Sequence, residues 1–219
     1  MIISVHIRKC AGTSLRSAFA AAFGDAAYFD YGDHIGSSWP SSLARRQQRQ
    51  VEAQRNIEAL SRYSLVHGHF FPEKYDFLPM AKQYVTFLRD PVDRVVSNYN
   101  YLKRNPARTH PDALIVHALG FSLTEFAAHP DNRNMQTTAL SGRTLESFDV
   151  VGVVEAYDES LTQLSRAIGV PLAQRPPANV ASAPKYLTNA ERAAIENANL
   201  DDMRLYDRAM SRFLRKAVA

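Results

Sequence analysis

The chain has 219 residues, 46% apolar and 22% charged, a balance typical of a soluble globular protein, and we expect one domain over residues 1–219. A single cysteine excludes an internal disulfide framework and a multi-cysteine zinc site, and no segment approaches the roughly 18 apolar residues that cross a membrane. The net charge of +4 favours an anionic partner but does not distinguish a nucleic acid, an acidic glycan or a nucleotide.

The first residues, MIISVHIRK, have the pattern of a buried strand over Ile2–Ile7. They do not resemble a signal peptide, because no basic segment precedes the apolar run. We therefore expect a cytoplasmic protein.

Short apolar runs alternate with amphipathic segments along the rest of the chain. We expect further strands at 64–70, 83–90 and 148–157, a loop at 25–40, and helices at 15–23, 41–61, 91–104, 122–130, 132–142, 158–169, from about 188 and from about 201. Gly24 and Gly169 are suited to end helices, and Ser41 or Ser42 to begin one. This alternation predicts an α/β fold with an open, mostly parallel sheet flanked by helices. In such sheets ligands bind beyond the carboxyl ends of the strands.

The segment HIRKCAGTSL, residues 6–15, joins the first strand to the first helix. Lys9 supplies a positive charge, and Gly12 allows a close approach of the backbone or a positive φ. Thr13 and Ser14 can cap the helix and donate hydrogen bonds, and the backbone N–H groups of a helix N-terminus bind phosphate-like anions. An ordinary strand–turn–helix junction has similar residues, so this loop alone does not decide between the two interpretations.

The phosphate-binding loop of nucleotide triphosphatases, G-x-x-x-x-G-K-[ST], does not fit this segment. Lys9 precedes Gly12, and no glycine opens the loop. Asp149 is a poor candidate for the magnesium ligand that a kinase needs. The sequence therefore disfavours a kinase.

A second motif, FLRDPVDRVVSNYNYLKR, spans residues 87–104. Arg89 ends a strand, Asp90 and Pro91 turn the chain, and Ser97 follows about two helical turns later. An arginine fork with a nearby hydroxyl suits a second phosphate group. The alternative is that Arg89 pairs with a neighbouring aspartate at the start of the helix.

Taken together, the two motifs resemble the donor-binding segments of sulfotransferases that use 3′-phosphoadenosine 5′-phosphosulfate (PAPS). HIRKCAGTSL resembles the loop that is commonly H-I-P-K-T-A-G-T-S in that superfamily, and LRDPVDRVVSNYNYL resembles its 3′-phosphate motif. The resemblance is closest to the heparan sulfate 2-O-sulfotransferase group and its bacterial relatives. It extends in order to VHGHF (66–70), NMQTTALSG (134–142), VVGVVEAYDESL (150–161), NVAS (179–182) and LYDRAM (205–210).

The resemblance implies a P-loop-like sulfotransferase fold, PAPS as the donor and no metal. It assigns the 5′-phosphosulfate to Arg8, Lys9, Cys10, Ala11, Gly12, Thr13 and Ser14, and the 3′-phosphate to Arg89 and Ser97. Arg8 stands where proline is usual and adds a positive charge. Cys10 stands where threonine is usual, so a weak S–H donor replaces a hydroxyl. A thiol near Lys9 and a helix N-terminus could have a lowered pKa, or it could simply pack.

Transfer to a hydroxyl needs a general base, for which histidine is suited. His67 and His69 flank Gly68, which leaves room for the donor or acceptor, and residues two apart on a strand share a face. Resemblance to the H-G-H of the 2-O group implies that His69 is the base, with His67 a helper or acceptor-binding residue. Glu73 is the second candidate for the base. A metal site is disfavoured because two histidines are only half of a zinc site.

The acceptor is less determined than the donor. The family implies a carbohydrate hydroxyl, and the positive charge favours an acidic oligosaccharide or polysaccharide. Arginines at 45, 46, 49 and 55 form either a solvated face or a grip on such an acceptor. A lipid, a small metabolite or a tyrosine is an alternative acceptor, and a non-catalytic nucleotide-binding module is a further alternative. No nucleic-acid-binding motif is present, and the oligomeric state is not indicated.

Overall fold

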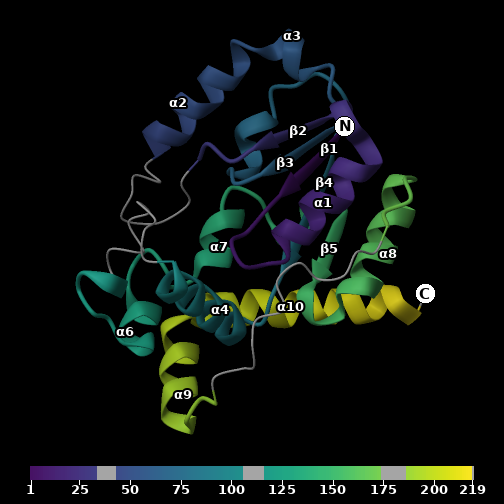
Figure 1. Ribbon diagram of the computed structural model, residues 1–219. Helices are drawn as coiled ribbons and strands as arrows, with labels where there is room; N and C mark the ends of the chain where they lie inside the picture. The colour runs from purple at the N-terminus through teal and green to yellow at the C-terminus, as the bar shows by residue number, and fades with distance from the viewer. Residues whose placement is uncertain (34–42, 106–115, 174–185, 219) are drawn as a thin grey trace.

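The computed structural model describes residues 1–33, 43–105, 116–173 and 186–218. Five parallel strands form one sheet in the order β2-β3-β1-β4-β5 (Figure 1). The strands are β1 (Ile2–Val5), β2 (Ala27–Asp30), β3 (Leu65–Gly68), β4 (Gln83–Leu88) and β5 (Val150–Val153). The expected α/β architecture with a parallel sheet flanked by helices is therefore confirmed.

One strand was missed by the sequence reading. The stretch expected to be a loop at 25–40 contains β2, which pairs with β3 at the edge of the sheet. Only Asp30 of its four residues is buried, so the segment lacks the apolar pattern of the central strands. Pairing with β3 makes this segment a strand, and pairing is not visible in local periodicity.

The observed helices lie close to the positions expected from the sequence. They are α1 (Gly12–Phe23), α2 (Leu43–Gln54), α3 (Ile57–Leu60), α4 (Pro91–Arg104), α6 (Leu123–Ala128), α7 (Met135–Leu140), α8 (Tyr157–Ile168), α9 (Asn189–Ala198) and α10 (Leu200–Val218). Short 3₁₀ turns occur at η1 (Gly24–Ala26), η2 (Pro72–Tyr75), η3 (Leu145–Ser147) and η4 (Val154–Ala156). The single helix expected at 41–61 is divided into α2 and α3, and its proposed caps, Ser41 and Ser42, lie outside the described residues. The same is true of the NVAS segment at 179–182.

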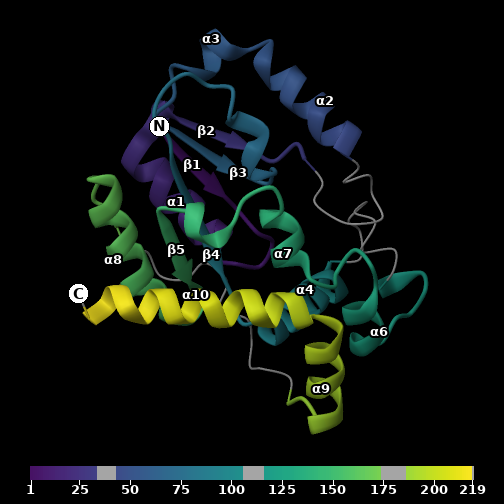
Figure 2. The same ribbon diagram turned by 180° about the vertical axis from the view of Figure 1, so that it is seen from behind.

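Two apolar layers cover the sheet, one on each face. On one face α1 and α8 pack through Leu15, Phe19, Leu161 and Leu164. On the other face α7 and α10 pack through residues such as Met135 (Figures 1 and 2). A third cluster joins α4, α6 and α9. Within the described ranges, no helix is both long enough and apolar enough to span a membrane.

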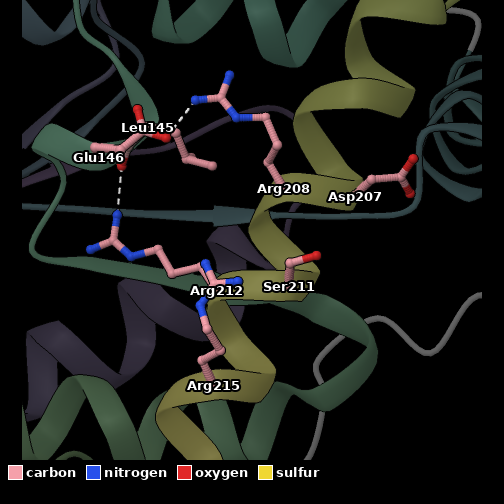
Figure 3. Close-up of a pocket in the computed structure, with 7 residues that line it drawn as sticks. All are labelled: Leu145, Glu146, Asp207, Arg208, Ser211, Arg212 and Arg215. Atoms are coloured by element: carbon pink, nitrogen blue, oxygen red, sulfur yellow. Dashed lines mark hydrogen bonds and ion pairs between the residues drawn. The ribbon is translucent and has the colours of Figure 1, made fainter.

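A pocket of about 490 Å³ lies between α10 and η3 (Figure 3). Two of the arginines that line it, Arg208 and Arg212, attach α10. Arg212 donates to the carbonyl oxygens of Leu145, at 2.6 Å, and of Phe148, and Arg208 pairs with Glu146 at 2.5 Å. Phe148 precedes β5, so this pocket lies near the amino end of that strand. The carboxyl ends, where a ligand is expected, are at the opposite edge of the sheet.

Candidate active site

The loop between β1 and α1 has the backbone form of an anion site. Lys9 and Ala11 both have positive φ, at 68° and 57°, and α1 begins at Gly12 with Ala11 as its N-cap. Turns of mixed handedness place successive N–H groups around one concavity, and the helix N-terminus adds a positive partial charge. The expectation that Thr13 and Ser14 cap the helix is wrong: both lie inside its first turn, with Thr13 exposed.

Gly12 is required for a close contact, and the partner is a side chain of the protein itself. A Cβ atom on Gly12 would lie 1.7 Å from Nε2 of His6. The His6 ring therefore packs directly against the backbone of the loop and supports it. Burial lowers the pKa of His6 well below 6.5, helped by the charges of His67 and Lys9, so the ring is neutral.

Arg89 brings the two motifs together. It follows the last residue of β4, and its Nη1 donates to the carbonyl oxygen of Lys9 at 3.4 Å. The side chain of Asp90 caps α4 and does not pair with Arg89: it accepts a hydrogen bond from the backbone N–H of Asp93 at 2.9 Å. Among the residues that the structure describes, none accepts a hydrogen bond from the buried Nε of Arg89. A buried guanidinium nitrogen without an acceptor fits a site that receives an anion.

Helix α4 adjoins the same loop. The Lys9 ammonium lies 4.2 Å from the centroid of the Tyr101 ring. Ser97 precedes Tyr101 by four residues and is half-buried, so the two residues are on the same side of the helix. Lys9, Arg89 and the Ser97 side of α4 therefore meet at the carboxyl ends of β1 and β4.

Cys10 is buried and directed into the core. Its Sγ lies 3.5 Å from Oε1 of Gln136 and 3.8 Å from the carbonyl oxygen of Arg8. Burial raises the pKa of the thiol to about 12, although the charges of Arg94 and Arg89 oppose this shift. The idea of a lowered thiol pKa is therefore wrong, and the packing alternative is correct. Only the backbone of Cys10 is left to meet an anion.

His67 is fully buried and supports the site from within. Its Nδ1 lies 2.9 Å from the hydroxyl of Ser4, and its ring stacks on His6 with 5.3 Å between centroids. Burial lowers the pKa of His67 to about 3, and the charge of His69 adds to this shift. A side chain with no exposed surface does not reach an acceptor, so an acceptor-binding role for His67 is not supported.

His69 lies just beyond the end of β3 and is half-buried. Its ring centroid is 4.5 Å from that of His6 and 4.9 Å from that of Tyr31. His67 also contacts both rings, so the two histidines share a face as their spacing predicts. Gly68 was expected to leave room for the donor or the acceptor, but it leaves room for β2. A Cβ atom there would lie 1.6 Å from the carbonyl oxygen of Asp30, so only glycine allows β2 to approach this closely.

Glu73, the alternative base, is held in an ion pair. Its Oε1 lies 3.3 Å from Nη1 of Arg46, whose guanidinium also stacks on the Phe71 ring at 3.5 Å and donates to Ser141. Arg49 similarly pairs with Asp33, at 3.4 Å, and with Glu52. Arg46 and Arg49 therefore form ion pairs within the protein. This favours a structural role for these two arginines over a grip on an acidic acceptor. Within the described ranges, no group of three or more His, Cys, Asp or Glu side chains is arranged to hold a metal ion.

Gln136 and Asp202 were not identified as part of the site from the sequence. Both are completely buried, and Gln136 contacts Arg89 and Cys10 through its side chain. The available signal was a polar residue on the buried side of a short helix, between Met135 and Ala139. Such a residue needs partners, but the sequence does not say which ones.

In this open parallel sheet β1 leads into a loop with the backbone form of an anion site, and Arg89 reaches that loop from the end of the neighbouring strand β4. The fold is therefore that of an α/β protein with a candidate anion site at the carboxyl ends of its strands. The family model described as "Sulfotransferase family" matches residues 1–218, and the chain belongs to this family.

The solved structures that are similar to the chain include two sulfotransferases. A sulfotransferase from Alicyclobacillus acidocaldarius has a TM-score of 0.46 and 16% identity, covering 93% of this chain and 92% of that one. The mouse sulfotransferase SULT7A1, complexed with PAP, has a TM-score of 0.39 and 12% identity, covering 92% of this chain and 64% of that one. A comparison with curated proteins found no match. The closer resemblance to the heparan sulfate 2-O group stays a prediction.

Proposed function

We propose that the protein is a PAPS-dependent O-sulfotransferase with a carbohydrate acceptor. The observation that carries this proposal is the contact between Arg89 and the carbonyl oxygen of Lys9, at 3.4 Å. It joins two phosphate-binding motifs that are 80 residues apart in the chain. A donor with a 5′-phosphosulfate and a separate 3′-phosphate needs two such clamps close together.

The residues present fit this donor. The loop from Lys9 to Ser14 offers a cationic side chain, a helix N-terminus and two hydroxyls for the phosphosulfate. Arg89, with its buried Nε, and Ser97 on α4 suit the 3′-phosphate. Arg8 is partly exposed and adds a second positive charge beside the loop.

The donor supplies a sulfuryl group, which passes to an acceptor oxygen as the bond between sulfur and the bridging phosphate oxygen breaks. Lys9 and the N–H groups of the loop stabilise the negative charge that grows on the leaving phosphate, so the step does not require a metal. The acceptor hydroxyl loses its proton to a base as the new S–O bond forms.

His69 is the base that the geometry favours. It is half-buried beside the loop, with the His6 ring between it and Gly12. His67 is fully buried, and Glu73 is engaged by Arg46. An imidazole accepts a proton only when it is neutral, so activity should fall as the medium is acidified.

An acidic glycan is the proposed acceptor. The net charge of +4 and Arg8 beside the loop favour an anionic acceptor, whereas Arg46 and Arg49 already have acidic partners. Sulfation of a lipid, a small metabolite or a tyrosine is the alternative, since the donor loop does not encode the acceptor. A screen of acidic oligosaccharides against neutral phenols with labelled donor would separate them.

Calorimetry tests the donor assignment without an acceptor. We expect adenosine 3′,5′-bisphosphate to bind at least tenfold more tightly than 5′-AMP, because a charge-assisted hydrogen bond contributes about 1.5–3 kcal/mol. Equal affinities would contradict the second clamp, and tight binding without sulfuryl transfer to any acceptor would favour the non-catalytic module.

A further inference from the structure

The side-chain amide of Gln136 holds the backbone of Arg89. Its Oε1 accepts from the Arg89 N–H at 2.9 Å, and its Nε2 donates to the Arg89 carbonyl oxygen at 2.9 Å. The last paired residues of the neighbouring strands are Leu88 and Val153, so Arg89 lies just beyond the ladder between β4 and β5. The Gln136 amide therefore makes the two backbone hydrogen bonds that a neighbouring strand would otherwise make with Arg89.

Two hydrogen bonds to the same residue determine the direction of its side chain as well as its position. With both the N–H and the carbonyl of Arg89 held, the direction in which its Cα–Cβ bond leaves the backbone is fixed. The side chain of Arg89 starts from this fixed point, and its guanidinium reaches the carbonyl oxygen of Lys9 in the loop. The same Oε1 of Gln136 receives the Cys10 thiol, at 3.5 Å, so one amide contacts both phosphate-binding motifs.

Gln136 is itself held from the opposite side. Its backbone N–H donates to Oδ2 of Asp202 at 3.0 Å, and the next N–H, of Thr137, donates to Oδ1 at 2.7 Å. Asp202 belongs to α10 and has no exposed surface. A buried carboxylate that accepts two N–H bonds at the start of a helix is a rigid anchor, so the amide of Gln136 does not shift easily.

We propose that Gln136 is a positioning residue that sets the distance between the two phosphate clamps and so makes the site selective for a 3′-phosphorylated donor. This inference rests on the proposed function. It adds that selectivity depends on a residue 47 positions after Arg89 that does not need to touch the donor.

Gln136→Met tests the proposal, because methionine has a similar length and removes both hydrogen bonds to Arg89, together with the acceptor for the Cys10 thiol, without adding charge. We expect the affinity for adenosine 3′,5′-bisphosphate to fall about tenfold and that for 5′-AMP to change less than about twofold. The ratio of the two affinities should fall accordingly, and the KM for PAPS should rise more than kcat falls. Thr137→Val is the matched control: it is the next residue of α7, and none of the described residues bonds its buried Oγ1.

The readout separates positioning from mere stability. Loss of packing alone lowers the melting temperature and leaves the ratio of affinities unchanged, and that result for Gln136→Met would overturn the inference. If this variant does not fold, Gln136→Leu also removes the bonds to the Arg89 backbone without adding charge, and the same drop in ratio is expected. A wild-type protein without preference for the bisphosphate would instead contradict the proposed function, and that measurement needs no variant.

Discussion

The loop from His6 to Ser14 and the helix α2 are held to the sheet in different ways. The loop is fixed by buried, mostly neutral contacts: the His6 ring on Gly12, the Cys10 thiol on Gln136, and the Arg89 guanidinium on a backbone carbonyl. Helix α2 is fixed by ion pairs, among them the pair of Arg46 with Glu73 and the pair of Arg49 with Asp33. The Arg49 side chain is 44% exposed. Directional bonds in a buried setting define atomic positions, whereas partly solvated ion pairs attach an element without determining its geometry closely. Changes near the loop should therefore alter catalysis, and changes in α2 should alter stability.

The largest effect is expected for His69→Ala. Removing a general base costs about 10² to 10⁴ in rate, while the affinity for the bisphosphate should stay within about threefold. Single-turnover transfer from labelled donor measures the rate, and calorimetry measures the affinity. A variant that keeps nearly full activity would move the base to Glu73, for which Glu73→Gln is the next test.

Lys9→Ala should reduce turnover by about 10² to 10³, because the ammonium stabilises charge that develops on the leaving phosphate. Lys9→Arg keeps the charge and should be less impaired. Steady-state rates at saturating acceptor provide the comparison. Activity should also resist EDTA. If EDTA inactivated the protein and zinc restored the activity, a metal and not Lys9 would stabilise the charge on the leaving phosphate.

Arg89→Ala should weaken binding of the bisphosphate by about ten- to a hundredfold, from the loss of a charge-assisted contact with the 3′-phosphate. Arg49→Ala is the matched control, because it removes an arginine from α2 and not from the site, and it should leave this affinity unchanged. Calorimetry on both variants is sufficient. A similar loss in each would show that net charge, and not the clamp, determines affinity.

The buried histidines should make the protein sensitive to acid. His67 has a pKa of about 3 when folded and an ordinary value of 6.5 when unfolded, so below pH 6.5 the unfolded chain binds the extra proton. The free energy of unfolding should fall as the pH decreases from 6.5 towards 3, by about 1.4 kcal/mol per pH unit from this group at most. Urea unfolding of the wild type and His67→Gln at pH 7 and pH 5 measures it, and parallel losses in both would exclude His67 as the cause.

The smallest effects should come from α2. Arg46→Ala removes a guanidinium that stacks on Phe71 and pairs with Glu73, and should lower the free energy of unfolding by about 1–3 kcal/mol. Arg49→Ala breaks more exposed pairs and should cost below about 1 kcal/mol. Chemical unfolding gives both values. Neither variant should change the affinity for the bisphosphate, and a loss of donor affinity in either would remove the distinction between the two regions.

The sequence by itself determined the elements whose signals are local. The apolar run Ile2–Ile7, the turn residues that follow it and the turn at Asp90 and Pro91 were sufficient to place a strand–loop–helix unit and a second strand–helix unit. The alternation of such units predicted the parallel sheet and the position of the site at the strand ends. Each of these inferences depends on residues within a few positions of one another, which is the range over which periodicity and turn chemistry act.

Only the tertiary structure decided what the individual residues of the site contact. Gly12 and Gly68 were correctly singled out, but their neighbours are the His6 ring and the backbone of β2. Cys10 lies beside a cationic loop in the sequence, yet its thiol is buried and its pKa is raised. Gln136 reaches Arg89 across 47 positions, and β2 is a strand because β3 lies next to it. These outcomes depend on which segments pack together, because burial, hydrogen-bond partners and electric fields are properties of neighbours in space.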